Sequence, residues 1–345
     1  MSKRCTEYSV DRCLKMAVEC PEMDLSAEHR QTVDVRVLLI HGFPLMSYAG
    51  VVEPLRAANL IGGETLYRIA HCGVGERMTA SSSGNLVPVR PVAEQATEPD
   101  YLFVVAGGNP YRVGDPSIFA CLRQAARRKV TICGVSGGPV VMARAGIMSG
   151  YRMTVHWEHA PALQESMTDI YLERSLFVVD RDRITCAGGI ASLDLMHTLI
   201  VRHNGNSLAN RVSDWFLHTQ IREPEGTQRS GLVERYGTTR RPLIAALSQM
   251  ENHIADPLTL DQIAILSGVG MRHLNRLFRS HLDVSPMEHY RTLRLEHARR
   301  LLLGTTLSVT EIALATGFSG SSHFTCAFRT LFGMAPTACR ATEGT

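Results

Sequence analysis

Two stretches in the last third of the sequence carry side chains suited to binding nucleic acid. In residues 258–286 and again in residues 307–336, apolar residues recur at helical spacing, so the polar residues between them face the other way. Arginine, asparagine and hydroxyl side chains on such a face can reach base edges and phosphates in a DNA major groove. The candidate DNA contacts are Met271, Arg272, His273, Asn275, Arg276 and Arg279 in the first stretch, and Gly320, Ser321, Ser322, His323, Thr325 and Arg329 in the second.

The two stretches are copies of one another, and each predicts two short helices joined by a tight turn. Gly268 and Gly317 are separated by 49 positions (317 − 268), and Phe278 and Phe328 by 50 (328 − 278). A glycine at the turn tolerates the left-handed backbone that ends a helix sharply. Each copy begins with a capping box, which satisfies free N–H groups at a helix start; the boxes are Thr259 with Gln262 and Ser308 with Glu311.

A pair of helices with a polar outer face is more often a solvated part of a helical bundle than a DNA reader. The cap, the glycine turn and the outward arginine occur in both copies, and this repetition favours DNA binding. The net charge of the chain is only +3, so attraction to DNA has to come from the local grouping of arginines.

This region resembles the AraC/XylS-type DNA-binding domain, in which a linking helix joins two helix-turn-helix units. The matching segments are "HLNRLFRSHLDVSP", "RLEHARRLL" and "SVTEIALATGFSGSSHFTCAFRTLFGMAP", with the linking helix from about Pro286 to Leu303. The resemblance implies a cytoplasmic transcriptional regulator whose partners are double-stranded DNA and RNA polymerase.

The composition is that of an ordinary globular protein with about two domains, since 345 residues and 45% apolar content suffice for buried cores. The nine cysteines include no C-x-x-C pair and no Cys/His set at zinc spacing, which favours a reduced cytosolic protein without metal or cofactor. Neither an 18-residue apolar run nor a signal-peptide core is present, so no membrane span is expected. Residues 1–31 are polar, and we expect a poorly ordered extension in which Cys5, Cys13 and Cys20 are scattered.

Strand-like and helix-like segments alternate from Val33 onwards, which predicts an α/β domain with an open, mostly parallel, flavodoxin-like sheet. A late strand pair is expected in "SLFVVDRDRITCAGG", followed by two closing helices. Residues 223–241 are polar and rich in glycine, threonine and arginine, which predicts a loosely tethered linker. The predicted organisation is an extension at 1–31, an effector-sensing and dimerising domain at 32–222, the linker at 223–241 and an all-α double helix-turn-helix domain at 242–340.

Ligands of open α/β sheets bind outside the carboxyl ends of the strands, where three junctions of this chain would meet. They contain Phe43, the pair Gly108–Asn109, and the turn "GVSGG", in which Ser136 and Gly137 lead from a strand directly into a helix. Such a turn is the geometry of a nucleophile elbow, and the N–H groups of Gly108 and Gly137 could bind an anion beside it. The alternative is that the glycines only permit close packing.

The first domain resembles the PfpI-type, glutamine-amidotransferase-like domain found fused to AraC-type regulators, through "EPLRAAN", "SGGPVVMARAGIMSGYRMTVHWEH" and "ITCAGGIASLDL". Catalytic members hold a cysteine at the elbow, where this chain has Ser136, whereas Cys133 lies inside the strand as a small buried residue. A serine nucleophile needs an adjacent base; His156 is the nearest candidate, with Glu53 or Glu158 as its acid.

A pocket retained for sensing is the favoured interpretation of this departure. Glu53, which the resemblance places facing the elbow, would bind a cation, the N–H groups of Gly108 and Gly137 would bind a carboxylate, and His156 and Trp157 would form a wall. These features suit an amino acid or a betaine-like zwitterion, although His156 and Trp157 could equally be a packed core pair. The resemblance extends to regulators of arginine, glycine betaine or carnitine use.

The sequence therefore predicts a homodimeric, ligand-responsive transcriptional regulator, an activator of a catabolic operon for a nitrogen compound. One alternative is a serine-dependent amidase or hydrolase with a DNA-binding tail. Another is a constitutive DNA-binding protein whose first domain only dimerises.

Overall fold

The protein is described here from a computed structural model, which covers residues 32–342 apart from residues 75–76, 93–97 and 168. The predicted extension at 1–31, with Cys5, Cys13 and Cys20, lies outside the described residues. Strands and helices alternate up to Trp215, and the elements that follow are helices. No helix in the described part of the chain combines the length and the apolar character needed to cross a membrane.

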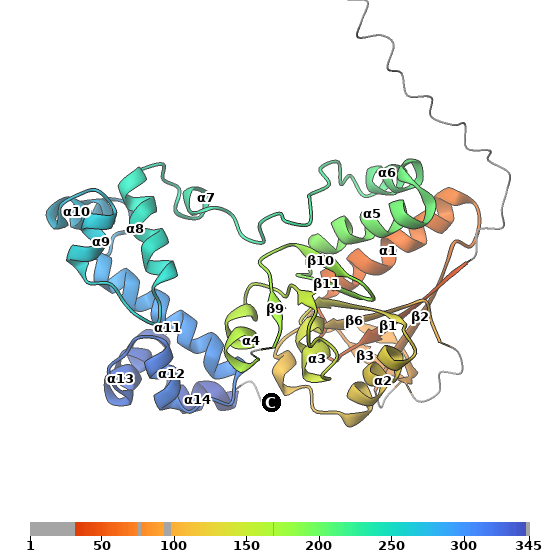
Figure 1. Ribbon diagram of the computed structural model, residues 1–345, viewed down its shortest axis with the longest axis horizontal. Coiled ribbons are helices and arrows are strands. Elements are labelled where there is room, and N and C mark those ends of the chain that lie inside the picture. The colour runs from red at the N-terminus through yellow and green to blue at the C-terminus, as the bar shows by residue number, and fades with distance from the viewer. Residues whose placement is uncertain (1–31, 75–76, 93–97, 168, 343–345) are drawn as a thin grey trace, which may run out of the picture. The chain divides into compact units, whose positions relative to one another are not determined.

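Seven strands form one sheet in the order β10-β11-β7-β6-β1-β2-β5 (Figure 1). Every neighbouring pair is parallel except β10 and β11, which form an antiparallel hairpin. The predicted parallel sheet and its late strand pair are both confirmed. The strands are β1 (Val33–Leu39), β2 (Tyr67–Gly73), β5 (Arg90–Pro91), β6 (Tyr101–Ala106), β7 (Thr131–Ser136), β10 (Phe177–Asp180) and β11 (Arg183–Cys186).

Helices cover both faces of this sheet, because successive side chains of a buried strand point to opposite sides. In β1, Val37 and Leu39 pack in a core with α1, α5 and α6, whereas Leu38 packs in a second core with α2 and α3. Figure 1 shows α1, α5 and α6 on one side of the sheet and α2 and α3 on the other. The covering helices are α1 (Leu45–Gly62), α2 (Pro116–Arg127), α3 (Gly138–Arg144), α5 (Ala191–Asn204) and α6 (Asn206–Trp215).

Several smaller elements decorate the sheet domain, and the sequence pattern did not predict them. Their short runs carry too few residues for a clear period. They are β3 (Met78–Ala80), β4 (Leu86–Pro88), the 3₁₀ helix η3 (Pro110–Arg112), β8 (Arg152–Met153), α4 (Ala160–Ser166) and β9 (Tyr171–Leu172).

The helical region contains two apolar cores, one for each copy of the repeat. The first core joins α8, α9 and α10 to the start of α11, and the second joins the end of α11 to α12, α13 and α14. The predicted linking helix is α11, which is one residue longer than expected. The helices are α8 (Arg241–Asn252), α9 (Leu260–Leu266), α10 (Met271–Leu282), α11 (Pro286–Gly304), α12 (Val309–Ala315), α13 (Ser321–Phe332) and α14 (Pro336–Thr342).

The segment from Arg222 to Arg229, which spans the predicted boundary between the sheet domain and the linker, is held on the sheet domain. The Arg222 guanidinium donates to the buried Asp194 carboxylate at 2.6 Å, and Gln228 Nε2 donates to the backbone oxygen of Ser175 at 2.7 Å. The expectation of a loose tether is therefore wrong for this segment, because its polar side chains satisfy buried acceptors of the sheet domain. A short helix, α7 (Leu232–Tyr236), follows.

Candidate nucleic-acid interface and effector site

The outer faces of α10 and α13 carry the predicted DNA contacts. In α10 the apolar stripe of Leu274, Leu277 and Phe278 is buried, and in α13 Phe324 and Phe328 are buried. Each of these stripes docks its helix on the neighbouring core, as the periodicity predicts. Every candidate contact from Met271 to Arg279 and from Gly320 to Arg329 is exposed or half-buried.

The arginines on these faces are not used for internal ion pairs. Within the described residues, Arg272, Arg276, Arg279 and Arg329 have no acidic partner within 4.0 Å. The Asn275 amide, by contrast, donates to the backbone oxygen of Met271 at 2.9 Å. The four guanidinium groups thus remain available for phosphates or base edges, which they can contact through two parallel hydrogen bonds.

The turns that orient α10 and α13 have the predicted local geometry. Thr259 and Ser308 each form a complete capping box at the start of α9 and α12. Gly268 and Gly317 adopt the left-handed φ values of 70° and 72° that the sharp exits require. A third capping box, in which Ser285 begins α11, was missed, although its Ser-x-x-Glu spacing is present in the sequence.

Ser136 forms a strained turn at the carboxyl end of β7, as predicted. Its φ of 61° lies in the left-handed region, which is costly for a residue other than glycine, and it is 7% exposed. The N–H of Gly137 donates to the backbone oxygen of Ala106 at 2.8 Å. The expected use of this N–H to bind a carboxylate is therefore wrong for this conformation, because the group already closes the contact between β6 and β7.

The loop after β6 places Gly108 and Asn109 near this turn, but the Asn109 amide is engaged. Its Nδ2 donates to the backbone oxygen of Leu303 in α11 at 2.6 Å, and its oxygen accepts from the Tyr111 N–H at 3.2 Å. Gly108 is exposed, with a left-handed φ of 56°. Asn109 thus contacts α11, and Gly108 is the freer of the two to approach a ligand.

Two predicted effector residues, Phe43 and Glu53, have other contacts. Phe43 is 0% exposed and packs in the core against Tyr48. Glu53 forms an ion pair with Arg56 at 2.7 Å and has a 42% exposed side chain. Glu53 is therefore paired on α1 in place of serving as the cation partner that we expected beside the elbow, and the Phe43 side chain is buried in the core.

Ser47 of α1 is the side chain that approaches the elbow in place of Glu53. It is 1% exposed, and its hydroxyl accepts from the Gly189 N–H at 2.7 Å. A Cβ placed on Gly188 would lie 2.8 Å from the Ser47 hydroxyl and 2.6 Å from the Ser136 Cβ, so these three residues are contiguous. The sequence signal that could have identified this position is that Ser47 is a hydroxyl residue on the buried face of α1.

His156 and Trp157 lie beside the Ser136 turn. The backbone N–H of His156 donates to the backbone oxygen of Ser136 at 3.5 Å. The Nδ1 atom of the His156 ring accepts from the backbone N–H of Glu158 at 3.4 Å. Burial lowers the pKa of His156, which favours the neutral ring. Among the described residues, no hydrogen bond joins this ring to the Ser136 hydroxyl.

The face of Trp157 is covered by a cation from the chain itself. The guanidinium carbon of Arg229 lies 4.4 Å from the centroid of the Trp157 ring, which is a cation–π contact. Gln228, the preceding residue, donates to Thr154 Oγ1 and to the Val155 oxygen, both at 3.0 Å. The linker segment therefore covers the Trp157 face that we expected to contact a ligand cation.

Cys133 is a buried strand residue, as the sequence indicated. It is 0% exposed, and burial raises the pKa of its thiol well above the ordinary value. A thiol that stays protonated is a poor nucleophile.

Comparisons with known proteins match both regions of this chain. The model of the DJ-1/PfpI family matches residues 34–202, and that of a helix-turn-helix domain matches residues 263–342. The HTH-type transcriptional regulator GlxA of Rhizobium meliloti is 43% identical over 323 residues, covering 93% of this chain and 100% of that protein. The regulators CdhR and GbdR of Pseudomonas aeruginosa are 40% and 34% identical, covering 89% and 90% of this chain and 91% and 84% of their own lengths.

Proposed function

We propose that this chain, which belongs to the AraC family of transcriptional regulators with an N-terminal DJ-1/PfpI domain, controls a catabolic operon in response to a small nitrogen compound. The observation that carries this proposal is the pair of exposed arginine-bearing faces on α10 and α13, each mounted on a buried apolar stripe. Two such helices, capped and turned alike, suit two successive major grooves about 34 Å apart. The chain would act as an activator, as a homodimer and together with RNA polymerase.

The effector would bind where the loops after β6 and β7 meet the His156–Trp157 segment. The cation–π contact of Arg229 supports a cationic ligand, because the Trp157 face already lies against a delocalised positive charge. An amino acid or betaine-like effector would compete with Arg229 for this face, and its carboxylate would approach the exposed Gly108. Arg229 belongs to the segment that leads to the helical region. Its displacement by the effector would therefore signal to the DNA-binding helices that the site is occupied.

Thermal-shift titration with amino acids and quaternary amines, glycine betaine among them, tests this effector site. A compound that binds the folded state raises the melting temperature. We expect Trp157→Ala to abolish the shift and Arg229→Ala to tighten binding by roughly twofold to fivefold, since a cation–π contact is worth about 0.5–1 kcal/mol. The matched control is Trp215→Ala, which removes the other tryptophan, a 55% exposed residue of α6. If both tryptophan variants respond equally, the Trp157 face is not the site.

The hydrolase alternative is disfavoured by the placement of the candidate base. A serine nucleophile needs a base within hydrogen-bond reach. The Nδ1 atom of the His156 ring instead accepts a hydrogen bond from the backbone N–H of Glu158. We expect no turnover of amide or ester substrates by the wild-type chain, and therefore no difference between it and Ser136→Ala in single-turnover assays. Turnover that disappears in Ser136→Ala would restore an enzymatic role.

A further inference from the structure

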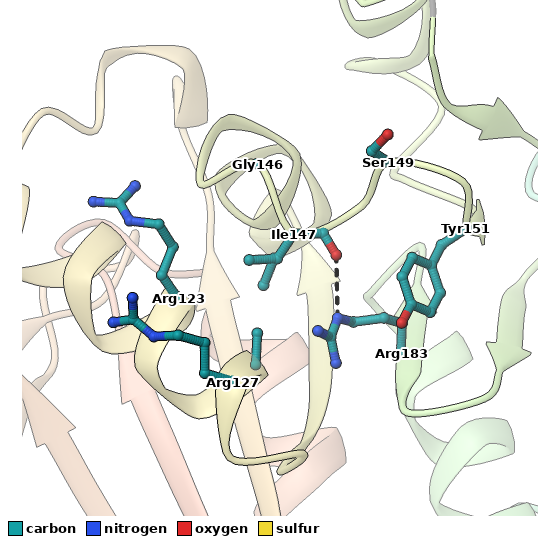
Figure 2. A pocket seen from close by; sticks show the side chains of 8 residues that line it. Arg123, Arg127, Gly146, Ile147, Ser149, Tyr151 and Arg183 are labelled. Carbon is teal, nitrogen blue, oxygen red and sulfur yellow. Dashed lines mark hydrogen bonds between the residues drawn. The ribbon is translucent and has the colours of Figure 1, made fainter.

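A cavity of the sheet domain lies at the opposite edge of the sheet from Ser136. Its volume is about 370 Å³, and Figure 2 shows its lining from α2, from the loop after α3 and from β11. Arg183 begins β11 and pairs with Ile132 of β7, whereas Ser136 ends β7 four residues later, about 13 Å further along the strand. The cavity is therefore separate from the proposed effector site.

The lining of this cavity is strongly cationic. Three of its eight residues are arginines and none is acidic; the set is Arg123, Ala126, Arg127, Gly146, Ile147, Ser149, Tyr151 and Arg183. Arg123 and Arg127 are exposed and one turn apart on α2, and neither forms an ion pair with any described residue. Like charges at this spacing repel one another, so an anion bound between them and Arg183 would relieve a mutual repulsion.

Within the described residues, the Arg183 guanidinium is held through Nε and Nη1, and its Nη2 edge carries no hydrogen bond. It is 4% exposed, its Nε donates to the Ile147 oxygen at 3.2 Å, and its Nη1 lies 2.9 Å from the Asp182 carboxylate. In the described part of the chain, Nη2 has no hydrogen-bond partner, yet it is not among the side-chain nitrogens sealed from solvent. In Figure 2 the guanidinium points towards the side of the cavity formed by α2. Arg183 thus presents a fixed donor towards α2, from which Figure 2 shows the exposed Arg123 and Arg127 side chains extending on the other side.

We propose that this cavity binds a phosphate group. Its guanidinium groups come from two elements on different sides, and the tetrahedral oxygens of a phosphate can accept from several directions, whereas a carboxylate offers one planar edge. The volume is at the lower end of the range for small-molecule sites, which suits a small phosphate ester. A phosphate of the DNA backbone has the same chemistry, and the experiment has to separate these two sources.

The first arm of the experiment measures binding of inorganic phosphate and glycerol phosphate to the full chain by thermal shift, with chloride at equal ionic strength as reference. The test variant is Arg127→Gln, and the matched control is its neighbour Arg128→Gln, which removes the same charge outside the cavity, where Arg128 pairs with Glu98. Loss of a charged hydrogen bond is expected to weaken phosphate binding roughly tenfold in Arg127→Gln, with no change in Arg128→Gln. Equal effects in the two variants, or no phosphate-specific shift in the wild type, would overturn the proposal.

The second arm titrates a random-sequence DNA duplex at several salt concentrations, because non-specific binding depends on phosphate contacts. If the cavity binds a small phosphate ester, Arg127→Gln leaves DNA affinity unchanged. If it binds the DNA backbone, Arg127→Gln reduces the salt slope by about one and Arg128→Gln does not.

Discussion

Replacing Arg276 by alanine is expected to weaken binding to cognate DNA by roughly tenfold to hundredfold. Arg276 is exposed on α10, beside the buried Leu277 that docks the helix, and it has no internal ion pair within the described residues. Its guanidinium is therefore available to hydrogen-bond DNA, and a contact from an arginine to a base contributes about 1–3 kcal/mol of binding free energy. The measurement is a gel-shift titration on a duplex that the wild-type chain selects from a random library.

Arg291→Ala is the matched control for this prediction. Arg291 is likewise exposed and lies on α11, outside the two recognition faces. Both variants lose one positive charge, so a general electrostatic contribution would weaken DNA binding equally in the two. An equal loss would contradict a specific role for Arg276. The melting temperature should be nearly unchanged in either variant, because surface substitutions rarely exceed about 0.5 kcal/mol.

The helical region could be predicted closely from the sequence because its determinants are local. A capping box joins residues three positions apart, and a left-handed turn depends on one residue, as at Gly268. The stripe containing Leu274 and Phe278 fixes which side of α10 is buried, and hence which side is exposed. The mostly parallel sheet followed for the same reason, from strands and helices that alternate along the chain.

The site of the sheet domain could be predicted only in part, because its contacts join distant segments. Glu53 lies six residues after Ser47, which places it about 9 Å along α1 and about 240° around it, so only one of them can face the elbow. The match to the "EPLRAAN" segment did not show whether Ser47 or Glu53 faces the elbow. Similarly, nothing local to Trp157 indicates that Arg229 covers it, since the two are joined only by the fold.

The turn after Ser136 leads to the second large effect, because Gly138 makes the closest approach to another backbone among the described glycines of the sheet domain. Gly138 is the first residue of α3, and a Cβ placed on it would lie 2.0 Å from the backbone oxygen of Val104 in β6. A backbone atom of a central strand cannot move aside as a flexible side chain can. Gly138→Ala is therefore expected to destabilise the sheet domain by roughly 3 kcal/mol, the upper end of the usual cost of overpacking.

Thermal unfolding measures this effect, with an expected fall of roughly 6–12 °C in the sheet domain for a loss of about 3 kcal/mol. Gly114→Ala is the matched control, since its added Cβ would meet nothing closer than 3.7 Å. Among the described residues, the core of α10 contains no residue of the sheet domain, whereas the core of α13 includes Ala162 of α4. Gly138→Ala should therefore leave the DNA contacts of α10 intact wherever the chain stays folded. Equal melting temperatures for the two alanine variants would mean that α3 can shift away from β6, and the strained conformation of Ser136 would then not depend on that contact.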